Sequence, residues 1–113
     1  MINVMIRRDK EDQRISHITI KGHADFAQHG KDIVCAAVSA LAIGAVNSAE
    51  KLLQINLQPL NHPKDGGFLS WEVPIIKDPM LDNQLQLLMK ALILSLEMIE
   101  EEYERYIRVK KVD

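Results

Sequence analysis

Residues 78–107 read DPMLDNQLQLLMKALILSLEMIEEEYERYI and carry the clearest structural pattern of the chain. Large side chains with an apolar body recur here at spacings of three and four, as on one face of an α-helix: Leu81, Leu85, Leu88, Leu92, Leu96, Ile99, Tyr103 and Tyr106. Asp78 and Pro79 make a favourable start, because aspartate caps exposed N–H groups and proline fits the first turn. The pattern predicts a long amphipathic helix from about Pro79 to about Ile107.

The stretch before this helix has the alternation of a β-hairpin. Two runs of alternating apolar and polar residues flank a turn cluster at 61–67, with Ile55 and Leu57 before it and Leu69, Trp71 and Val73 after it. Pro59 cannot donate a hydrogen bond to a β-ladder, so the first run is expected at a sheet edge. We therefore predict a second pair of strands here.

Residues 33–53 predict another helix. From Ile33 the sequence is small and apolar on nearly every side, and it becomes amphipathic only toward Glu50 and Lys51. This composition is typical of a deeply buried helix. We expect the helix to run from Ile33 to near Leu53.

The first 21 residues predict a β-hairpin. Ile2, Val4 and Ile6 alternate with other residues, a polar stretch follows at 9–14, and Ile18 and Ile20 continue the alternation. Gly22 ends the second strand.

The elements therefore follow in the order β-β-α-β-β-α, and residues 1–113 have the length of a single domain. Connected hairpins favour antiparallel pairing, and two apolar helices need one shared sheet face. We expect an α+β fold with a four-stranded, mostly antiparallel sheet and two helices packed on one face. The apolar surplus of the last helix, or the open sheet face, would suit a partner subunit.

Composition excludes several classes of protein. Apolar residues make up 47% of the chain and charged residues 27%, which is typical of an ordered globular domain. The net charge of −2 lacks the basic surplus of a nucleic-acid binder, so no direct contact with nucleic acid is expected. We see no signal peptide and no run of 18 or more apolar residues, so we expect a cytoplasmic protein without a membrane span.

The only cysteine, Cys35, lies where a helix is predicted to begin. With Asp32 as the N-cap, Cys35 falls in the first helical turn, where unpaired N–H groups and the helix dipole stabilise a thiolate. His23 follows Gly22 at the end of a predicted strand. An imidazolium there would lower the pKa of the thiol and could protonate a leaving amine. These residue types are those of a Cys-His hydrolase.

Several alternatives stay open at this point. On composition alone, Cys35 is more often a buried core residue than a nucleophile. His29 competes with His23 as the base, whereas His17 and His62 are expected to face solvent. Ser39, one helical turn after Cys35, could be a core hydroxyl or a donor to the site.

Two further expectations concern the same region. Gly30, in the loop before Cys35, could let that loop open and close over a substrate. No metal site or other cofactor is expected, because one cysteine and four dispersed histidines provide no ligand pair at a zinc spacing.

Residues 22–39 resemble a known signature. Gly22-His23-Ala24, Gly30 and the run from Asp32 to Ser39 are similar to the G-H-A, G-x-D-I-V-C-A-A-V-S pattern of the ribosomal-processing cysteine protease family (Prp, a YsxB-like group). Chain length, the order of elements and the acidic last helix also fit that family. The resemblance implies that Cys35 is the nucleophile and His23 the general acid and base. Asp32 and Ser39 would support the site or contact substrate, and Gly22 and Gly30 would bound a mobile loop.

The resemblance also implies a specific function. Members of this family are cytoplasmic endopeptidases that form homodimers and remove a short N-terminal extension from a large-subunit ribosomal protein, number twenty-seven of that subunit. The expected partner is therefore that ribosomal protein precursor. Two other readings of the chain are a non-catalytic ribosome-associated assembly factor and a redox-sensing thiol protein, although the chain has no second cysteine to resolve an oxidised Cys35.

Overall fold

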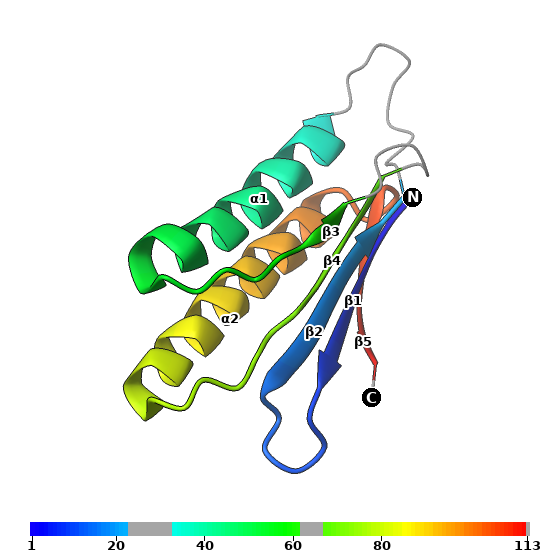
Figure 1. Cartoon of the computed structure of the whole chain (residues 1–113). Helices are drawn as coiled ribbons and strands as arrows, with labels where there is room; N and C mark the ends of the chain where they lie inside the picture. Colours follow the sequence, from blue (N-terminus) through cyan, green and yellow to red (C-terminus); the bar gives the residue numbers. More distant parts are fainter. Residues whose placement is uncertain (23–32, 62–66, 113) are drawn as a thin grey trace.

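A computed structural model describes residues 1–22, 33–61 and 67–112 of the chain, apart from the side chain of Phe68. Two helices and a five-stranded mixed sheet make up the fold (Figure 1). The elements are β1 (Ile2–Arg8), β2 (Ile15–Lys21), α1 (Ile33–Leu53), β3 (Leu60–Asn61), β4 (Phe68–Glu72), α2 (Pro79–Glu102) and β5 (Ile107–Val112).

The predicted first hairpin is confirmed, because β1 and β2 pair antiparallel. The alternating residues Ile2, Val4 and Ile6 are buried, so one face of β1 packs in the hydrophobic core. The connecting turn is closed by two backbone hydrogen bonds, from the Asp9 N–H to the Arg14 carbonyl and from the Gln13 N–H to the Asp9 carbonyl (2.9 Å each). This hairpin forms the middle of the sheet.

Helix α1 has the predicted bounds but not the predicted burial. Every third or fourth residue of one stripe is buried, namely Val34, Val38, Ala42, Val46 and Ala49. The opposite side is exposed, including Ala36, Ala40 and Ile43. The expectation of a deeply buried helix is wrong because the sheet covers α1 from one side only.

The predicted second hairpin is present, but its first strand lies later in the chain than predicted. Ile55 and Leu57 are buried, but they belong to an irregular segment. Among the described residues of this run, Leu60 and Asn61 are the ones that pair with β4. Gln54 and Gln58 have φ values of 59° and 50°, a left-handed conformation that interrupts a strand. Alternation alone therefore placed this strand too early in the chain, because β3 begins at Leu60 and includes Asn61, which was predicted as part of the turn.

The C-terminal part of the chain corrects the predicted fold. Helix α2 ends at Glu102, and Ile107–Val112 form a fifth strand that pairs parallel with β1. The sheet therefore has five strands instead of four, in the order β3-β4-β2-β1-β5. It is mixed because β1 and β5 pair parallel, whereas the other three pairings are antiparallel, as predicted. Ile107 pairs with Ile2 in this strand and is fully buried, so the chain leaves the helix before Ile107.

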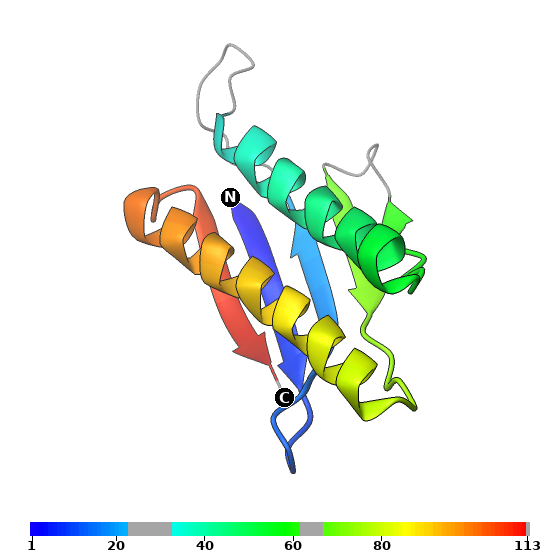
Figure 2. The ribbon, with the colours of Figure 1, turned by 90° about the vertical axis from the view of Figure 1, so that its left-hand side faces the viewer.

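Both helices lie on one face of the sheet, as predicted (Figures 1 and 2). The register makes β3 parallel to β2, and β5 parallel to β4, so each helix is the crossover between two parallel strands. The first crossover leads from β2 to β3, and the second leads from β4 to β5, in the opposite direction along the sheet. The strands from which they start, β2 and β4, are antiparallel. Two right-handed connections, which are the usual kind, then place both helices on the same face of the sheet.

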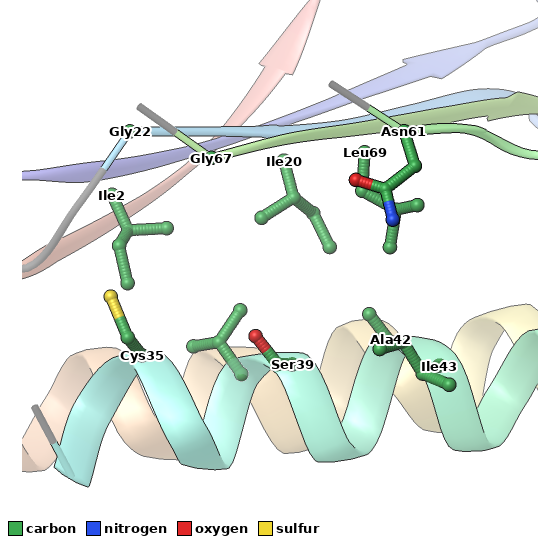
Figure 3. Close-up of a pocket in the computed structure, with 11 residues that line it drawn as sticks. Ile2, Ile20, Gly22, Cys35, Ser39, Ala42, Ile43, Asn61, Gly67 and Leu69 are labelled. Atoms are coloured by element: carbon green, nitrogen blue, oxygen red, sulfur yellow. The ribbon is translucent and has the colours of Figure 1, made fainter. Parts of the chain in front are cut away.

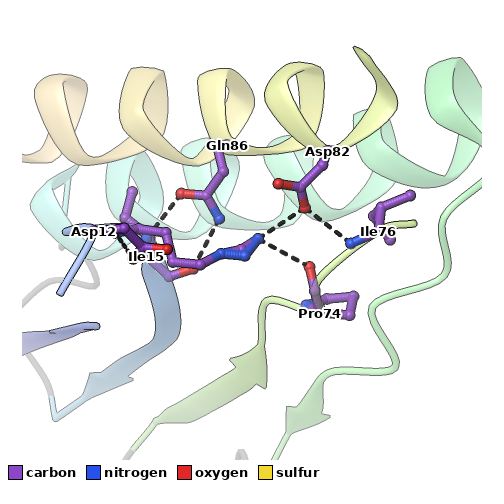
Figure 4. A network of polar contacts seen from close by, with 7 residues as sticks. Asp12, Ile15, Pro74, Ile76, Asp82 and Gln86 are labelled. Carbon is purple, nitrogen blue, oxygen red and sulfur yellow. Dashed lines mark hydrogen bonds and ion pairs between the residues drawn. The ribbon is translucent and has the colours of Figure 1, made fainter. Parts of the chain in front are cut away.

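Helix α2 is fastened to the first hairpin by a polar network (Figure 4). The buried amide of Gln86 accepts a hydrogen bond from the Ile15 N–H (2.8 Å) and donates one to the Ile15 carbonyl (2.9 Å). Arg14 forms an ion pair with Asp82 at 2.8 Å, and the same Asp82 oxygen accepts from the Ile76 N–H. Gln86 therefore completes the hydrogen bonding of a strand residue next to a β-bulge.

Among the described residues, α1 is the one helix whose length and composition would let it cross a membrane. Core helices of soluble proteins and signal sequences pass the same test, so this property is weak evidence. One side of α1 belongs to the hydrophobic core in the structure. The absence of a membrane span stays a prediction from the sequence.

Candidate active site

Cys35 lies in the first turn of α1, as the third residue of the helix. Its side chain is half-buried and packs against the hydrophobic core. In Figure 3 its sulfur points from the helix toward Ile2 and the sheet. The first N–H groups of a helix have no partner within it, so the thiol lies beside main-chain donors and the positive end of the helix dipole.

A cavity of about 310 Å³ opens beside Cys35, between α1 and the sheet. Figure 3 shows its walls, with the helix on one side and β1, β2, β3 and β4 on the other. The lining residues are Ile2, Ile20, Gly22, Cys35, Val38, Ser39, Ala42, Ile43, Asn61, Gly67 and Leu69. Most of this lining is apolar. The side chains that bring a polar group to it are Cys35, Ser39 and Asn61.

Gly22 closes the cavity near Cys35 and has a structural reason to be glycine. Its φ is +101°, and a Cβ built on it would lie 2.4 Å from the carbonyl oxygen of Met1. Its N–H donates a 2.8 Å hydrogen bond to the carbonyl of Gly67, which precedes β4. Any side chain at position 22 would push apart the ends of β1 and β2.

The structure brings together only part of the predicted site. Cys35, Ser39 and Gly22 line the same cavity. His23, Gly30 and Asp32 lie outside the described residues, as do the alternative base His29 and the predicted surface residue His62. The positions of these residues relative to Cys35 therefore remain predictions from the sequence.

His17 differs from its predicted solvent-facing position. It is half-buried, and its Nε2 atom lies 2.7 Å from the Ser70 hydroxyl in a hydrogen bond. His17 lines hollows other than the Cys35 cavity, so it has no place in the candidate site. Within the described ranges, no group of three or more His, Cys, Asp or Glu residues could hold a metal ion.

Sequence reasoning missed the sheet side of the cavity. Ile2, Ile20 and Leu69 were predicted as strand residues, and Asn61 as part of a turn, with no sign that they line one cavity with Cys35. Alternation indicates which residues of a strand share a face, but it does not indicate which helix covers them. Only the packing of α1 against this end of the sheet brings them to the site.

The described part of the site is suited to nucleophilic chemistry at Cys35. A thiolate at a helix N-terminus is a nucleophile, and neighbouring main-chain N–H groups can stabilise an oxyanion. The apolar trough between helix and sheet could hold an extended peptide beside the thiol. The arrangement suits attack on a peptide carbonyl, given a proton donor for the leaving amine.

Comparison with known proteins identifies the family. The family model described as "Cysteine protease Prp" matches residues 1–108. The ribosomal processing cysteine protease Prp of Bacillus subtilis is 41% identical over 110 residues, which cover 96% of each chain.

Solved structures agree in fold over almost the whole chain. SMU.848 from Streptococcus mutans is 29% identical and superposes with a TM-score of 0.85, covering 99% of this chain and 94% of its own. The ribosomal processing protease Prp of Staphylococcus aureus, solved with a covalently linked product peptide, is 32% identical with a TM-score of 0.79. That match covers 99% of this chain and 100% of the S. aureus chain.

Proposed function

The chain belongs to the Prp family of cysteine proteases, and we propose that it removes the N-terminal extension of a large-subunit ribosomal protein, number twenty-seven of that subunit. The observation that carries this proposal is the Cys35 thiol, in the first turn of a helix and at the end of a largely apolar cavity. The relatives named as ribosomal processing proteases support the substrate class. Since that substrate is a ribosomal component, we expect the reaction to occur in the cytoplasm.

The proposed reaction uses Cys35 and His23. The Cys35 thiolate attacks the scissile carbonyl carbon, and main-chain N–H groups at the start of α1 stabilise the resulting oxyanion. The C–N bond breaks as His23 donates a proton to the leaving amine, which leaves a thioester on Cys35. His23 then removes a proton from water, which attacks the thioester and releases the second product.

The remaining motif residues have supporting roles in this proposal. Asp32 caps α1 and orients the imidazole, and Ser39 contacts substrate from the wall of the cavity. Gly30 lets the loop before Cys35 close over the peptide. Such closure would complete the site only around the correct peptide and would limit cleavage of other proteins.

We further propose that the protein works as a homodimer whose contact lies on the outer side of α2. Four large apolar residues of this helix are 60% to 70% exposed and are spaced seven and four residues apart: Met80, Leu87, Leu94 and Met98. Residues at these spacings form one stripe along a helix. The same stripe of a second copy would cover it, as in the two-fold symmetric interfaces of most homodimers.

The bare face of the sheet is a poorer candidate for self-association. The register places four cationic residues on the side away from the helices, namely Arg7, Lys21, Arg108 and Lys110. Glu72, paired with His17, brings one negative charge to the same face. A second copy docked face to face would bring these cations together, and like charges across an interface are unfavourable.

Cleavage of the extended ribosomal protein tests the proposed function. The purified precursor is incubated with wild-type protein, Cys35→Ala and His23→Ala, and the products are identified by mass spectrometry. Wild type should release the extension at one bond, whereas each variant should be slower by at least about a thousandfold. Thermal unfolding of each variant is the control for folding.

Three results would each contradict a part of the proposal. Undiminished cleavage by both variants would exclude the Cys35–His23 pair. A wild type that binds the precursor without cutting it would favour an assembly factor. Rapid cleavage of unrelated unfolded proteins would separately exclude the gating by the loop.

A further inference from the structure

One polar side chain stands at the far end of the Cys35 cavity. Asn61 projects from β3 into the space between the sheet and α1, opposite Ala42 and Ile43 (Figure 3). The register explains this direction, because Asn61 pairs with Leu69, which lines the same cavity. Its neighbour Leu60 pairs with Ser70 and so belongs to the other face of the sheet.

The length of the cavity indicates how many peptide residues separate Asn61 from the scissile bond of a bound substrate. Cys35 lies near one end, and Ile43, eight residues later on α1, lies near the other. Eight helical residues rise about 12 Å, at about 1.5 Å per residue. An extended peptide advances about 3.3 Å per residue, so about four of its residues cover this length. A peptide that lies along α1 with its scissile carbonyl at Cys35 would therefore pass Asn61 about three to four residues from that bond.

The Asn61 amide is available for a ligand. Within residues 1–22, 33–61 and 67–112, no hydrogen bond of this side chain is formed, and the residue is exposed. An asparagine amide has both a donor and an acceptor, which match the C=O and N–H of a peptide main chain. A bound peptide that displaces water from this amide must replace the lost hydrogen bonds, because an unpaired buried amide is unfavourable.

We propose that Asn61 is a positioning residue that hydrogen-bonds the substrate main chain about three to four residues from the scissile bond. This inference rests on the proposed function and adds a residue on the sheet to the site on the helix. The bond holds the peptide in register along the cavity, so that the correct carbonyl meets Cys35. It acts on binding and alignment, at a distance from the proton transfers at Cys35.

A double-mutant cycle with modified peptides tests the role of Asn61. The substrates are synthetic peptides that span the junction between the extension and the mature ribosomal protein. In each peptide, one amide is replaced by an ester, which removes one N–H and weakens the adjoining carbonyl as an acceptor. The enzymes are wild type, Asn61→Ala and the matched control Asn83→Ala, which changes an exposed asparagine of α2 outside the cavity.

The expected result is specific to one position of the peptide. For wild type, one ester about three to four residues from the scissile bond should lower kcat/KM about tenfold, the size of one hydrogen bond. The same ester should have no effect on Asn61→Ala. With the all-amide peptide, Asn61→Ala should raise KM about tenfold with little change in kcat, whereas Asn83→Ala should match wild type.

Two results would overturn the inference in different ways. If each ester lowers kcat/KM equally for wild type and Asn61→Ala, or if Asn61→Ala cleaves as fast as Asn83→Ala, the positioning role is wrong while the proposed function stands. If wild type cleaves none of the peptides and does not cleave the full precursor, the proposed function is wrong. The positioning role of Asn61 is then wrong as well, because it depends on that function.

Discussion

Gly22 and Gly44 differ in whether the structure has room for a side chain at their positions. A Cβ on Gly22 would lie 2.4 Å from the Met1 carbonyl oxygen, and the φ of +101° is unfavourable for any other residue. Gly44 lies within α1, and apart from the helix's own backbone a Cβ there would meet no atom within 4 Å. Glycine is needed at position 22 by tertiary contact and is replaceable at position 44.

Gly22→Ala should therefore lower the free energy of unfolding by at least about 2 kcal/mol, because it adds backbone strain and a steric clash. Gly44→Ala should raise it by about 0.5–1 kcal/mol, since alanine favours a helix. Urea denaturation of both variants measures the difference. A Gly22→Ala protein of normal stability but altered activity would show that position 22 acts as a loop hinge, as the family signature implies.

The buried side chain of Gln86 stabilises the fold through its hydrogen bonds with one residue, Ile15. Its amide satisfies both the N–H and the carbonyl of Ile15. Gln86→Leu should lower the free energy of unfolding by about 2–4 kcal/mol, because two buried main-chain groups lose their partner. Gln84→Leu, at an exposed position of the same helix, is the control in the same denaturation assay. Equal stability of the two variants would show that water replaces the Gln86 amide.

At the level of elements, β5 decides the architecture more than any other segment. It adds a parallel strand beside β1 and makes α2 a crossover between β4 and β5. The turn between α2 and β5 is held by hydrogen bonds from the Tyr103 N–H to the Ile99 carbonyl and from the Tyr106 N–H to the Tyr103 carbonyl. The Val109 N–H also donates to the Glu100 carboxylate at 2.8 Å. These bonds fix the direction in which the chain leaves the helix.

The pairing of β5 with β1 makes Ile107 a core residue with no exposed surface. Ile107→Ala should lower the free energy of unfolding by about 2–5 kcal/mol, the usual effect of emptying such a site. Arg108→Ala, at the next and exposed position, should change it by less than about 0.5 kcal/mol. Chemical denaturation of both variants distinguishes a buried strand from a frayed helix end, for which the two substitutions would have similar small effects.

At the level of the whole molecule, the two-layer architecture leaves large surfaces uncovered. Both helices cover one face of the sheet, and nothing in the described chain covers their outer sides (Figure 2). The outer side of α2 is apolar along the stripe of Met80, Leu87, Leu94 and Met98, whereas the bare sheet face is cationic. This division of apolar and charged surface is the basis for placing the dimer contact on α2.

Sedimentation equilibrium should give wild type about twice the chain mass of 12.8 kDa. Leu94→Glu should shift the protein to monomer, because each copy would bury an unpaired carboxylate at the two-fold contact. Leu52→Glu, which changes a leucine that is 73% exposed at the end of α1, should leave the dimer intact. A dimer that survives Leu94→Glu would place the contact elsewhere.

The sequence by itself determined the elements whose signals are local. Small apolar composition located α1, and helical spacing located α2 but extended it past Glu102. Alternation located the first hairpin, and the distance of four residues placed Cys35 and Ser39 on one helix face. These features depend on contacts between neighbours in the chain, which periodicity records directly. The membership in a cysteine protease family was also recognisable from the motif around Cys35, and the comparisons confirm it.

The tertiary structure alone decided the features that depend on distant partners. Tyr103 and Tyr106 continue the helical spacing, yet the chain turns there because Ile107 gains a place beside Ile2 in the sheet. Asn61 faces the Cys35 cavity because β3 pairs with β4, and Gly22 is constrained by Met1. No local pattern records such contacts, since each joins separate parts of the chain and is favourable only once the sheet and helices have packed together.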